Sequence, residues 1–267
     1  SRLYPRAKPR GFTLQWIKIN QEAQTSNKLD ALIQLKRHQP HIKIRWIILP
    51  ILVLLLMYSW QQQIFTAWVL LPLIWTIIVL NHVLIAKTRR NKLEKIEQLN
   101  IDPIFWNKLK QQYPELSLKQ RRLIELGFKD YLALHVMQKQ AYAMPSHAVD
   151  ALWHVMLQYP IQYQQLCEQT IGRMLNHSPY DGTTRPEEQA KQLFEAWKYS
   201  CMLHGYNPRN TMQLPRLFAV DQVLGWENGQ SFELAQMTKD FAKYMQDQSS
   251  SSSSCSSSCS SCGGGGD

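Results

Sequence analysis

Residues 144–179 read MPSHAVDALWHVMLQYPIQYQQLCEQTIGRMLNHSP, and their apolar side chains recur at helical spacing. The first apolar stripe consists of Val149, Leu152, Trp153, Met156 and Leu157. This i, i+3, i+4, i+7, i+8 pattern is typical of an amphipathic helix, and Ser146 stands where an N-cap is needed. A second stripe follows Pro160, so the stretch predicts two amphipathic helices that meet at that proline.

The chain around this stretch also predicts helices. Asp102 precedes Pro103 as an N-cap, and Ser117 with Gln120 forms a capping box for a helix that reaches about residue 139. A third apolar stripe ends at Gly205, and residues 214–225 and 232–245 predict two further helices. No long alternating run indicates a sheet. The fold class expected for residues 100–247 is therefore all-α.

Two apolar runs, 42–60 and 64–86, lie almost end to end, with only glutamines between them. A helix needs about 20 residues to cross a bilayer, and both runs approach or exceed that length. A buried hairpin in a soluble core is the alternative, but neither run has a polar face. We therefore expect residues 42–86 to form a two-helix transmembrane hairpin.

Charge predicts the orientation of this hairpin. Residues 1–45 carry ten Lys or Arg against two acidic residues, and residues 87–129 carry eleven against five. Since cytoplasmic flanks of membrane spans are enriched in Lys and Arg, both termini are expected in the cytoplasm of a bacterium, with the protein in its inner membrane. Attraction to anionic lipid explains the basic residues more simply than binding of nucleic acid.

The expected organisation has five parts: a basic arm at 1–41, the hairpin at 42–86, a basic linker at 87–99, a helical cytosolic domain at 100–247 and a disordered tail at 248–267. The tail contains only polar residues, Cys and Gly after Gln248, with nothing apolar to bury. No cleavable signal peptide is visible, and the sequence begins at Ser1. Cytosolic cysteines are kept reduced, so structural disulfides are not expected.

The central stretch also holds a candidate metal site. Asp150 and His154 fall one helical turn apart, where they can touch each other or a shared partner. With Cys167 and His177 they offer ligands for zinc or iron, the carboxylate serving as ligand or as an acceptor that fixes the imidazole tautomer. Their spacing matches no standard zinc pattern. A core cysteine beside a structural Asp–His pair is the favoured alternative, and a nucleophilic Cys167 is disfavoured by its apolar face.

A second cysteine group lies in the tail. Cys255, Cys259 and Cys262 follow a C-x3-C-x2-C pattern. This spacing holds an iron–sulfur cluster in radical enzymes that use S-adenosylmethionine, but too few residues follow it here for their barrel. Soft-metal capture, thiol exchange, modification as a peptide-like substrate and simple low complexity remain open, the last being favoured.

A family resemblance covers roughly residues 100–230. Its signature positions are Met144, Pro145, Ser146, Val149, Asp150, Trp153, His154, Tyr163, Cys167, Gly172, His177, Trp197, Cys201, Gly205, Asn207, Pro208 and the run LPRLFAVDQVLG from Leu214. These residues resemble the glycine-rich-domain-containing protein family of bacteria, which has more distant plant relatives. Some relatives have a second histidine where this chain has Met156, and that departure counts against a metal model with an HxH pair.

The resemblance implies a helical fold but no reaction, because that family has no established biochemical activity. The leading functional hypothesis is a membrane-anchored interaction or scaffold protein with the lipid bilayer and a further protein as partners. The alternative is a metal-dependent enzyme or metal-handling protein that uses Asp150, His154, Cys167 and His177.

Overall fold

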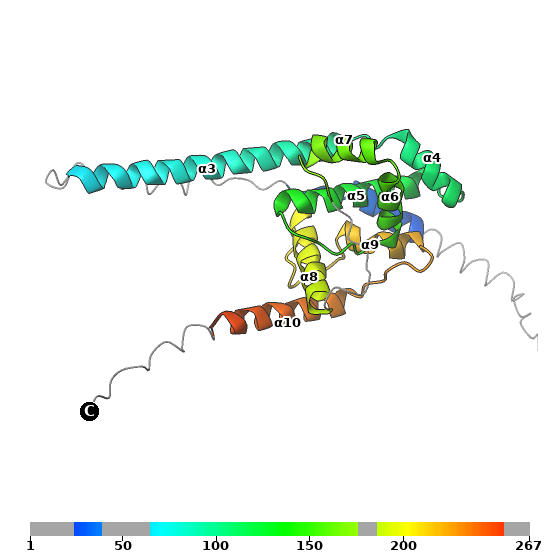
Figure 1. Ribbon diagram of the computed structural model, residues 1–267. Coiled ribbons are helices and arrows are strands. Elements are labelled where there is room, and N and C mark those ends of the chain that lie inside the picture. Colours follow the sequence, from blue (N-terminus) through cyan, green and yellow to red (C-terminus); the bar gives the residue numbers. More distant parts are fainter. Residues whose placement is uncertain (1–23, 39–64, 176–185, 254–267) are drawn as a thin grey trace, which may run out of the picture.

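The computed structural model describes residues 24–38, 65–175 and 186–253, and every regular element in these ranges is a helix. The expected all-α fold is confirmed. The helices are one over residues 24–34, then α3 (Phe65–Gln98), α4 (Pro103–Gln112), α5 (Leu118–Met137), α6 (His147–Leu157), α7 (Pro160–Thr170), α8 (Pro186–Leu203), α9 (Arg216–Leu224) and α10 (Leu234–Ser253). Figure 1 shows α3 and α10 at two edges of a body formed by the other helices.

Helix α5 is the centre of this body. It contacts α3, α6, α8 and α9, and its residues from Gly127 to His135 are all buried. A helix buried on every side belongs to the core of a domain. Its predicted capping box is present, since the Ser117 backbone N–H donates to Gln120 Oε1 at 2.9 Å and the Gln120 N–H donates to Ser117 Oγ at 3.3 Å.

A glycine brings α6 close to α5. A Cβ atom at Gly127 would lie only 2.8 Å from Cγ2 of Val149 and 3.2 Å from Cγ2 of Val220. The absence of a side chain at Gly127 therefore lets α6 and α9 approach α5 closely. This packing fixes the buried face of α6, and with it the direction of the opposite face that carries Asp150 and His154.

Helix α3 differs from the prediction in one respect. It continues without a break through residue 87, where a separate basic linker was expected, because no proline or glycine interrupts residues 87–98. Its early part projects beyond the body (Figure 1). The exposed large apolar side chains on this part are Ile77, Ile78, Leu80, Leu84 and Ile85.

None of the helices in the described parts of the chain combines the length and the apolar character that a membrane span requires. The predicted span at 42–60 lies outside the described residues. In the predicted span at 64–86, burial is described only from Trp75 onward.

Residues 24–38, here called the N-terminal clasp, pack against the body, although the sequence predicted only a basic arm. Arg37 Nε lies 2.7 Å from Asp130 Oδ1 on α5. His204 Nε2 and Arg216 Nη1 lie 3.2 Å and 3.4 Å from Asp130 Oδ2. Arg216 Nε also donates to the Leu32 carbonyl at 2.9 Å. The clasp is thus held by a buried ionic cluster whose members come from the clasp itself, from α5 and from the segment that runs from the end of α8 to the start of α9.

At the other end of the chain, α10 extends to Ser253 and so passes the predicted domain boundary at residue 247. A helix that has already formed adds residues at little cost, which explains its continuation into the serine run. The remainder of the predicted tail, residues 254–267, lies outside the described residues, and Cys255, Cys259 and Cys262 lie there with it.

Candidate functional site: an open polar pocket on helix α6

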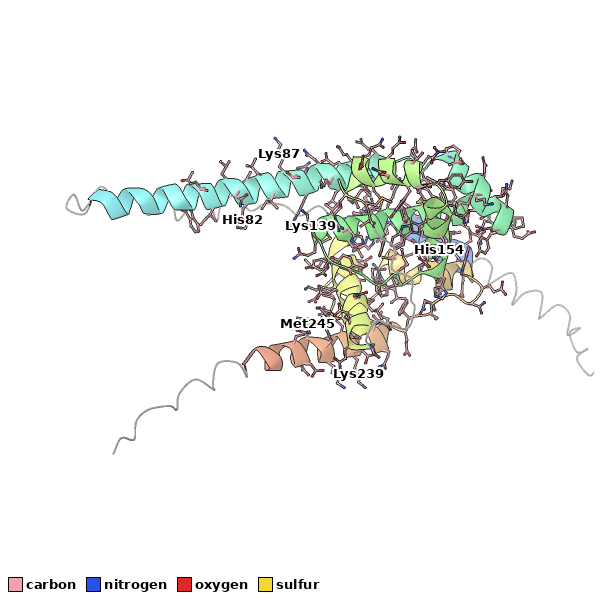
Figure 2. All side chains as sticks on the ribbon, viewed as in Figure 1. His82, Lys87, Lys139, His154, Lys239 and Met245 are labelled. Carbon is pink, nitrogen blue, oxygen red and sulfur yellow. The ribbon has the colours of Figure 1, made fainter. Side chains whose placement is uncertain are left out.

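Two of the predicted site residues meet on the outer face of α6. His154 Nδ1 lies 3.3 Å from Asp150 Oδ2, and their side chains are 53% and 26% exposed. The i, i+4 spacing in a helix accounts for this contact. His154 lies at the end of the body away from the projecting part of α3 (Figure 2).

The pair lines an open pocket of about 330 Å³, here called the α6 pocket. Three segments form it: the outer face of α6, the end of α4 and the loop after α9. Its lining residues are Gln112, Tyr113, His147, Asp150, Ala151, His154, Gln158, Trp226 and Glu227. The residues of α6 recur at spacings of three, four and seven, so one helix face forms this side of the pocket.

The pocket also contains an aromatic pair. The rings of Tyr113 and Trp226 lie 4.6 Å apart between centroids with an interplanar angle of 43°. Neither residue belongs to the central stretch of the sequence, and both come from segments that end a helix. Their contribution depends on tertiary packing, so no local sequence signal identifies them as partners of Asp150 and His154.

His147, at the start of α6, contacts the loop that follows α9. Its Nδ1 lies 2.6 Å from the Asn228 carbonyl oxygen, and its Nε2 lies 3.2 Å from the Gln230 side-chain nitrogen. Because a carbonyl oxygen only accepts, Nδ1 is the donor in the first of these contacts. The loop that carries Trp226 and Glu227 is therefore fastened to the start of α6.

Beneath this loop, Asp221 of α9 holds the N-terminus of α6. Its carboxylate accepts from Ser146 Oγ at 2.6 Å and from the backbone N–H groups of His147 at 2.7 Å, Ala148 at 3.1 Å and Gln230 at 2.8 Å. A carboxylate at a helix N-terminus satisfies its otherwise unpaired N–H groups and interacts favourably with the helix dipole. Two distant stretches of the sequence, MPSH from Met144 and LPRLFAVDQVLG from Leu214, thus meet at one buried cap.

We expect Ser146→Ala to lower the free energy of unfolding by about 2 kcal/mol, because it removes a buried N-cap and one donor to Asp221. Ser146 is fully buried and also accepts from the Val149 N–H at 3.2 Å. Denaturant unfolding of the purified full chain in detergent measures the change. Ser117→Ala removes the more exposed cap of α5 and should cost about 1 kcal/mol; an equal or smaller cost for Ser146→Ala would contradict this account.

Cys167, a third residue of the predicted metal site, lies in the core and does not line the α6 pocket. It is buried on α7, and burial raises the pKa of its thiol, which keeps it protonated and weakly nucleophilic. Beside it, Tyr163 receives a hydrogen bond from Trp153 Nε1 at 2.8 Å and donates to the Leu175 carbonyl at 2.9 Å. These contacts agree with the alternative in which Cys167 is a core residue.

The predicted metal site is not assembled among the described residues. In these ranges no three His, Cys, Asp or Glu side chains are grouped so that they could hold a metal ion. The structure brings Asp150 to His154 but does not bring Cys167 to them. His177 lies outside the described residues.

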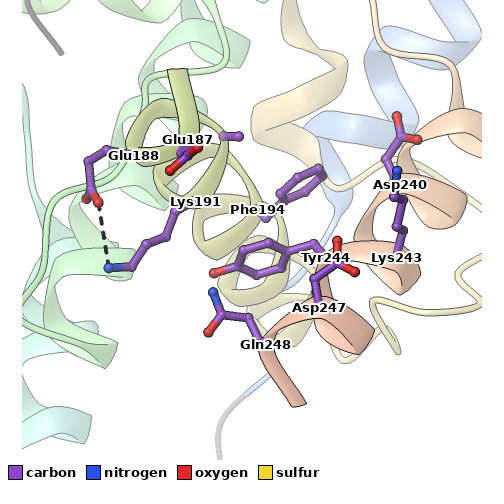
Figure 3. Close-up of a pocket in the computed structure, with 10 residues that line it drawn as sticks. Glu187, Glu188, Lys191, Phe194, Asp240, Lys243, Tyr244, Asp247 and Gln248 are labelled. Atoms are coloured by element: carbon purple, nitrogen blue, oxygen red, sulfur yellow. Dashed lines mark ion pairs between the residues drawn. The ribbon is translucent and has the colours of Figure 1, made fainter. Parts of the chain in front are cut away.

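A second depression lies between α8 and α10. It measures about 690 Å³, and Figure 3 shows the side chains that line it. Phe194 and Tyr244 stack there with their ring centroids 4.9 Å apart, and Lys191 lies 3.7 Å from Glu188. Four carboxylates and two lysine ammonium groups line this groove, so acidic side chains predominate around the stacked rings.

The fold and the α6 pocket define the protein as an all-helical domain with an open polar pocket at one end. The chain belongs to the UCP032817-like family, whose model matches residues 91–258. Comparisons with curated proteins and with solved structures returned no match. The resemblance to glycine-rich-domain-containing proteins stays a prediction.

Proposed function

We propose that this protein is a membrane-anchored interaction module whose helical body lies on the cytoplasmic face of a bacterial inner membrane. Residues 42–86 are the anchor in this proposal. The body that follows them is the part that meets a protein partner.

The apolar side chains on the projecting part of α3 support the anchor. Ile77, Leu80 and Leu84 are each more than half exposed there. Contiguous exposed apolar surface of this kind marks contact with a membrane or another protein. Lys87, Arg89 and Arg90 follow directly and are exposed, as is typical of the cytoplasmic border of a membrane span.

The observation that carries the proposal is the docking of the N-terminal clasp. The clasp precedes residues 42–86 and the body follows them, yet Arg37 and Asp130 form a buried ion pair between the two. Because the clasp contacts the body, the two flanks of residues 42–86 lie on one side of any membrane that these residues enter. The clasp therefore favours a hairpin that crosses twice over a single crossing.

An interaction role is supported by the two depressions of the body. The α6 pocket and the α8–α10 groove are both open to solvent and lined largely by polar side chains. Helix α6, which forms one side of the α6 pocket, lies at the end of the body away from the projecting part of α3 (Figure 1), where a cytosolic partner has access to it.

Reporter fusions test the topology. Alkaline phosphatase, which is active only in the periplasm, should be inactive when fused after residue 247 or before residue 24, while green fluorescent protein should fluoresce at both places. Fusion of alkaline phosphatase into the glutamine loop at 61–63 should restore activity. Phosphatase activity at either flank, or recovery of the full chain in the soluble fraction, would overturn the anchored arrangement.

A further inference from the structure

Three segments that are distant in the sequence bring basic residues to one end of the body. They are residues 77–93 of α3, residues 131–146 at the end of α5 and in the loop after it, and residues 169–175 at the end of α7. None of these segments contains Asp or Glu, although Arg90 pairs with Glu94 just beyond the first of them at 2.9 Å. Their basic residues, here called the basic surface, are Lys87, Arg89, Arg90, Lys92, Lys139 and Arg173.

Two contacts between side chains and neighbouring helices hold the three segments together. Lys92 Nζ donates to the carbonyl oxygen of Ile171 at 2.5 Å, which joins α3 to the end of α7. Arg173 Nη2 lies 3.4 Å from His135 Nδ1, which joins the end of α7 to α5. Helix α3 also contacts both α5 and α7. The basic surface is therefore a product of tertiary packing and is more than the run of charges that follows an apolar segment.

Three members of the basic surface are exposed and available to a partner. They are Lys87, Arg89 and Lys139, and Figure 2 shows Lys87 and Lys139 at the end of the body from which α3 projects. Within the described ranges none of the three forms an ion pair with a carboxylate, and the nearby Glu195 pairs with Lys198 at 3.4 Å. Like charges gathered in this way create a positive potential that attracts anions.

The apolar side chains beside the basic surface indicate the kind of anion. Leu84 and Ile85, directly before Lys87, are 53% and 43% exposed, and Met174 beside Arg173 is 42% exposed. An anionic bilayer presents its phosphates directly above hydrocarbon, so it matches both the charged and the apolar groups. A nucleic acid has no hydrocarbon layer beneath its phosphates and would leave these apolar side chains in water.

We propose that Lys87, Arg89 and Lys139 bind the headgroups of anionic phospholipids, so that the C-terminal end of α5 lies against the bilayer. This inference rests on the proposed function, because it requires α3 to enter the membrane before Lys87. It adds the orientation of the body: α5 meets the lipid surface with its C-terminal end, and α6 faces away from it. Lys139 is the decisive residue, since it lies outside the apolar segment and its flanks.

Amine acylation of the full chain in lipid nanodiscs, read by mass spectrometry, tests the orientation. Lys239 is the internal control, because it is also exposed but lies on α10, at the opposite edge of the body from α3 (Figure 2). Replacing phosphatidylcholine with phosphatidylglycerol should slow acylation of Lys139 about fivefold and leave that of Lys239 unchanged. Salt at about 0.5 M should remove most of this protection, because it screens exposed charges.

Substitution of the two lysines gives a second readout. The full chain in detergent is titrated with short-chain phosphatidylglycerol and with short-chain phosphatidylcholine, and bound lipid is counted by native mass spectrometry. Lys139→Gln should lower the preference for phosphatidylglycerol about fivefold. Lys239→Gln is the matched control and should keep the preference of the parent chain.

Equal protection of Lys139 and Lys239 in nanodiscs, or an unchanged lipid preference in Lys139→Gln, would overturn the proposal. Equal protection of Lys139 by a single-stranded oligonucleotide in phosphatidylcholine nanodiscs would also overturn it, since the surface would then bind polyanions in general. The anchor is judged separately by the reporter fusions. Loss of lipid preference with the expected topology rejects the basic surface alone, and wrong topology with the preference retained in detergent rejects the anchor.

Discussion

Replacing Asp130 with Ala is expected to lower the free energy of unfolding by about 3–5 kcal/mol, the usual cost of removing one partner from a buried ion pair. The side chain of Asp130 is inaccessible to solvent, and those of Arg37 and Arg216 are 4% and 2% exposed. Without Asp130 both guanidinium groups stay buried but lose the carboxylate that balances their positive charge. Denaturant unfolding of the full chain in detergent, followed by near-UV circular dichroism, measures the loss.

The matched control is Asp30→Ala. Asp30 pairs with Lys119 at 2.9 Å, but these side chains are 41% and 59% exposed. Because solvent screens such a pair, its removal should cost about 1 kcal/mol or less. A second readout follows from the clasp itself: in Asp130→Ala, residues 24–38 should become sensitive to limited proteolysis. An equal loss of stability in both variants would contradict a special role for the buried cluster.

The ionisation of Asp130 determines the pH at which the buried ion pairs stop contributing to the stability of the folded protein. Burial alone raises the pKa of the carboxyl group, but Arg216, Arg37 and His204 outweigh burial and hold the pKa well below its ordinary value. The contribution is therefore fully present above the unfolded pKa of about 3.9 and is lost only as the pH falls below it. Milder acid should leave the cluster intact.

Acidification from pH 6.5 to pH 4 should nevertheless destabilise the folded protein by up to roughly 3 kcal/mol through His135. Burial, with a smaller contribution from Arg173, lowers the pKa of His135 to about 4. The unfolded chain therefore binds a proton in this pH window that the folded chain does not, so stability falls as the pH falls. The His135 ring makes edge contacts with the rings of Tyr131 and Tyr142, and its Nε2 has no hydrogen-bond partner among the described residues.

Unfolding free energies at pH 7 and pH 4.5 measure this effect. His135→Phe keeps an aromatic ring in the same place and should remove most of the difference between the two pH values. His154→Gln, at the exposed end of α6, is the control and should retain the difference. If His135→Phe were as sensitive to acid as the parent chain, the buried imidazole would not be the group that titrates.

The helices could be predicted from the sequence because their signals are local. Caps at Asp102, Ser117 and Ser146 and the stop at Gly205 each act within a few residues, and the structure confirms them. The contact of Asp150 with His154 has the same origin, since it requires only one helical turn.

The rest of the site could not be predicted, since it joins residues that are far apart in the chain. Tyr113 and Trp226 meet only after α4 and α9 have packed near α6. Cys167 belongs to the same stretch of sequence as His154, but it lies on the buried face of α7 and is therefore a core residue. The N-terminal clasp was missed for a similar reason, as its basic residues also fitted a membrane flank and nothing local identified Asp130 as the partner of Arg37.

The contacts of the clasp determine the order in which parts of the chain fold during synthesis. Arg216 bonds the carbonyl of Leu32 across 184 positions, and His204 contacts Lys36 across 168. These partners are synthesised long after residues 42–86 have left the ribosomal tunnel, and contacts of such long range form late in folding. If residues 42–86 enter the membrane as proposed, insertion precedes closure of the clasp. The buried cluster around Asp130 then forms only when both flanks of the hairpin lie on the same side of the membrane.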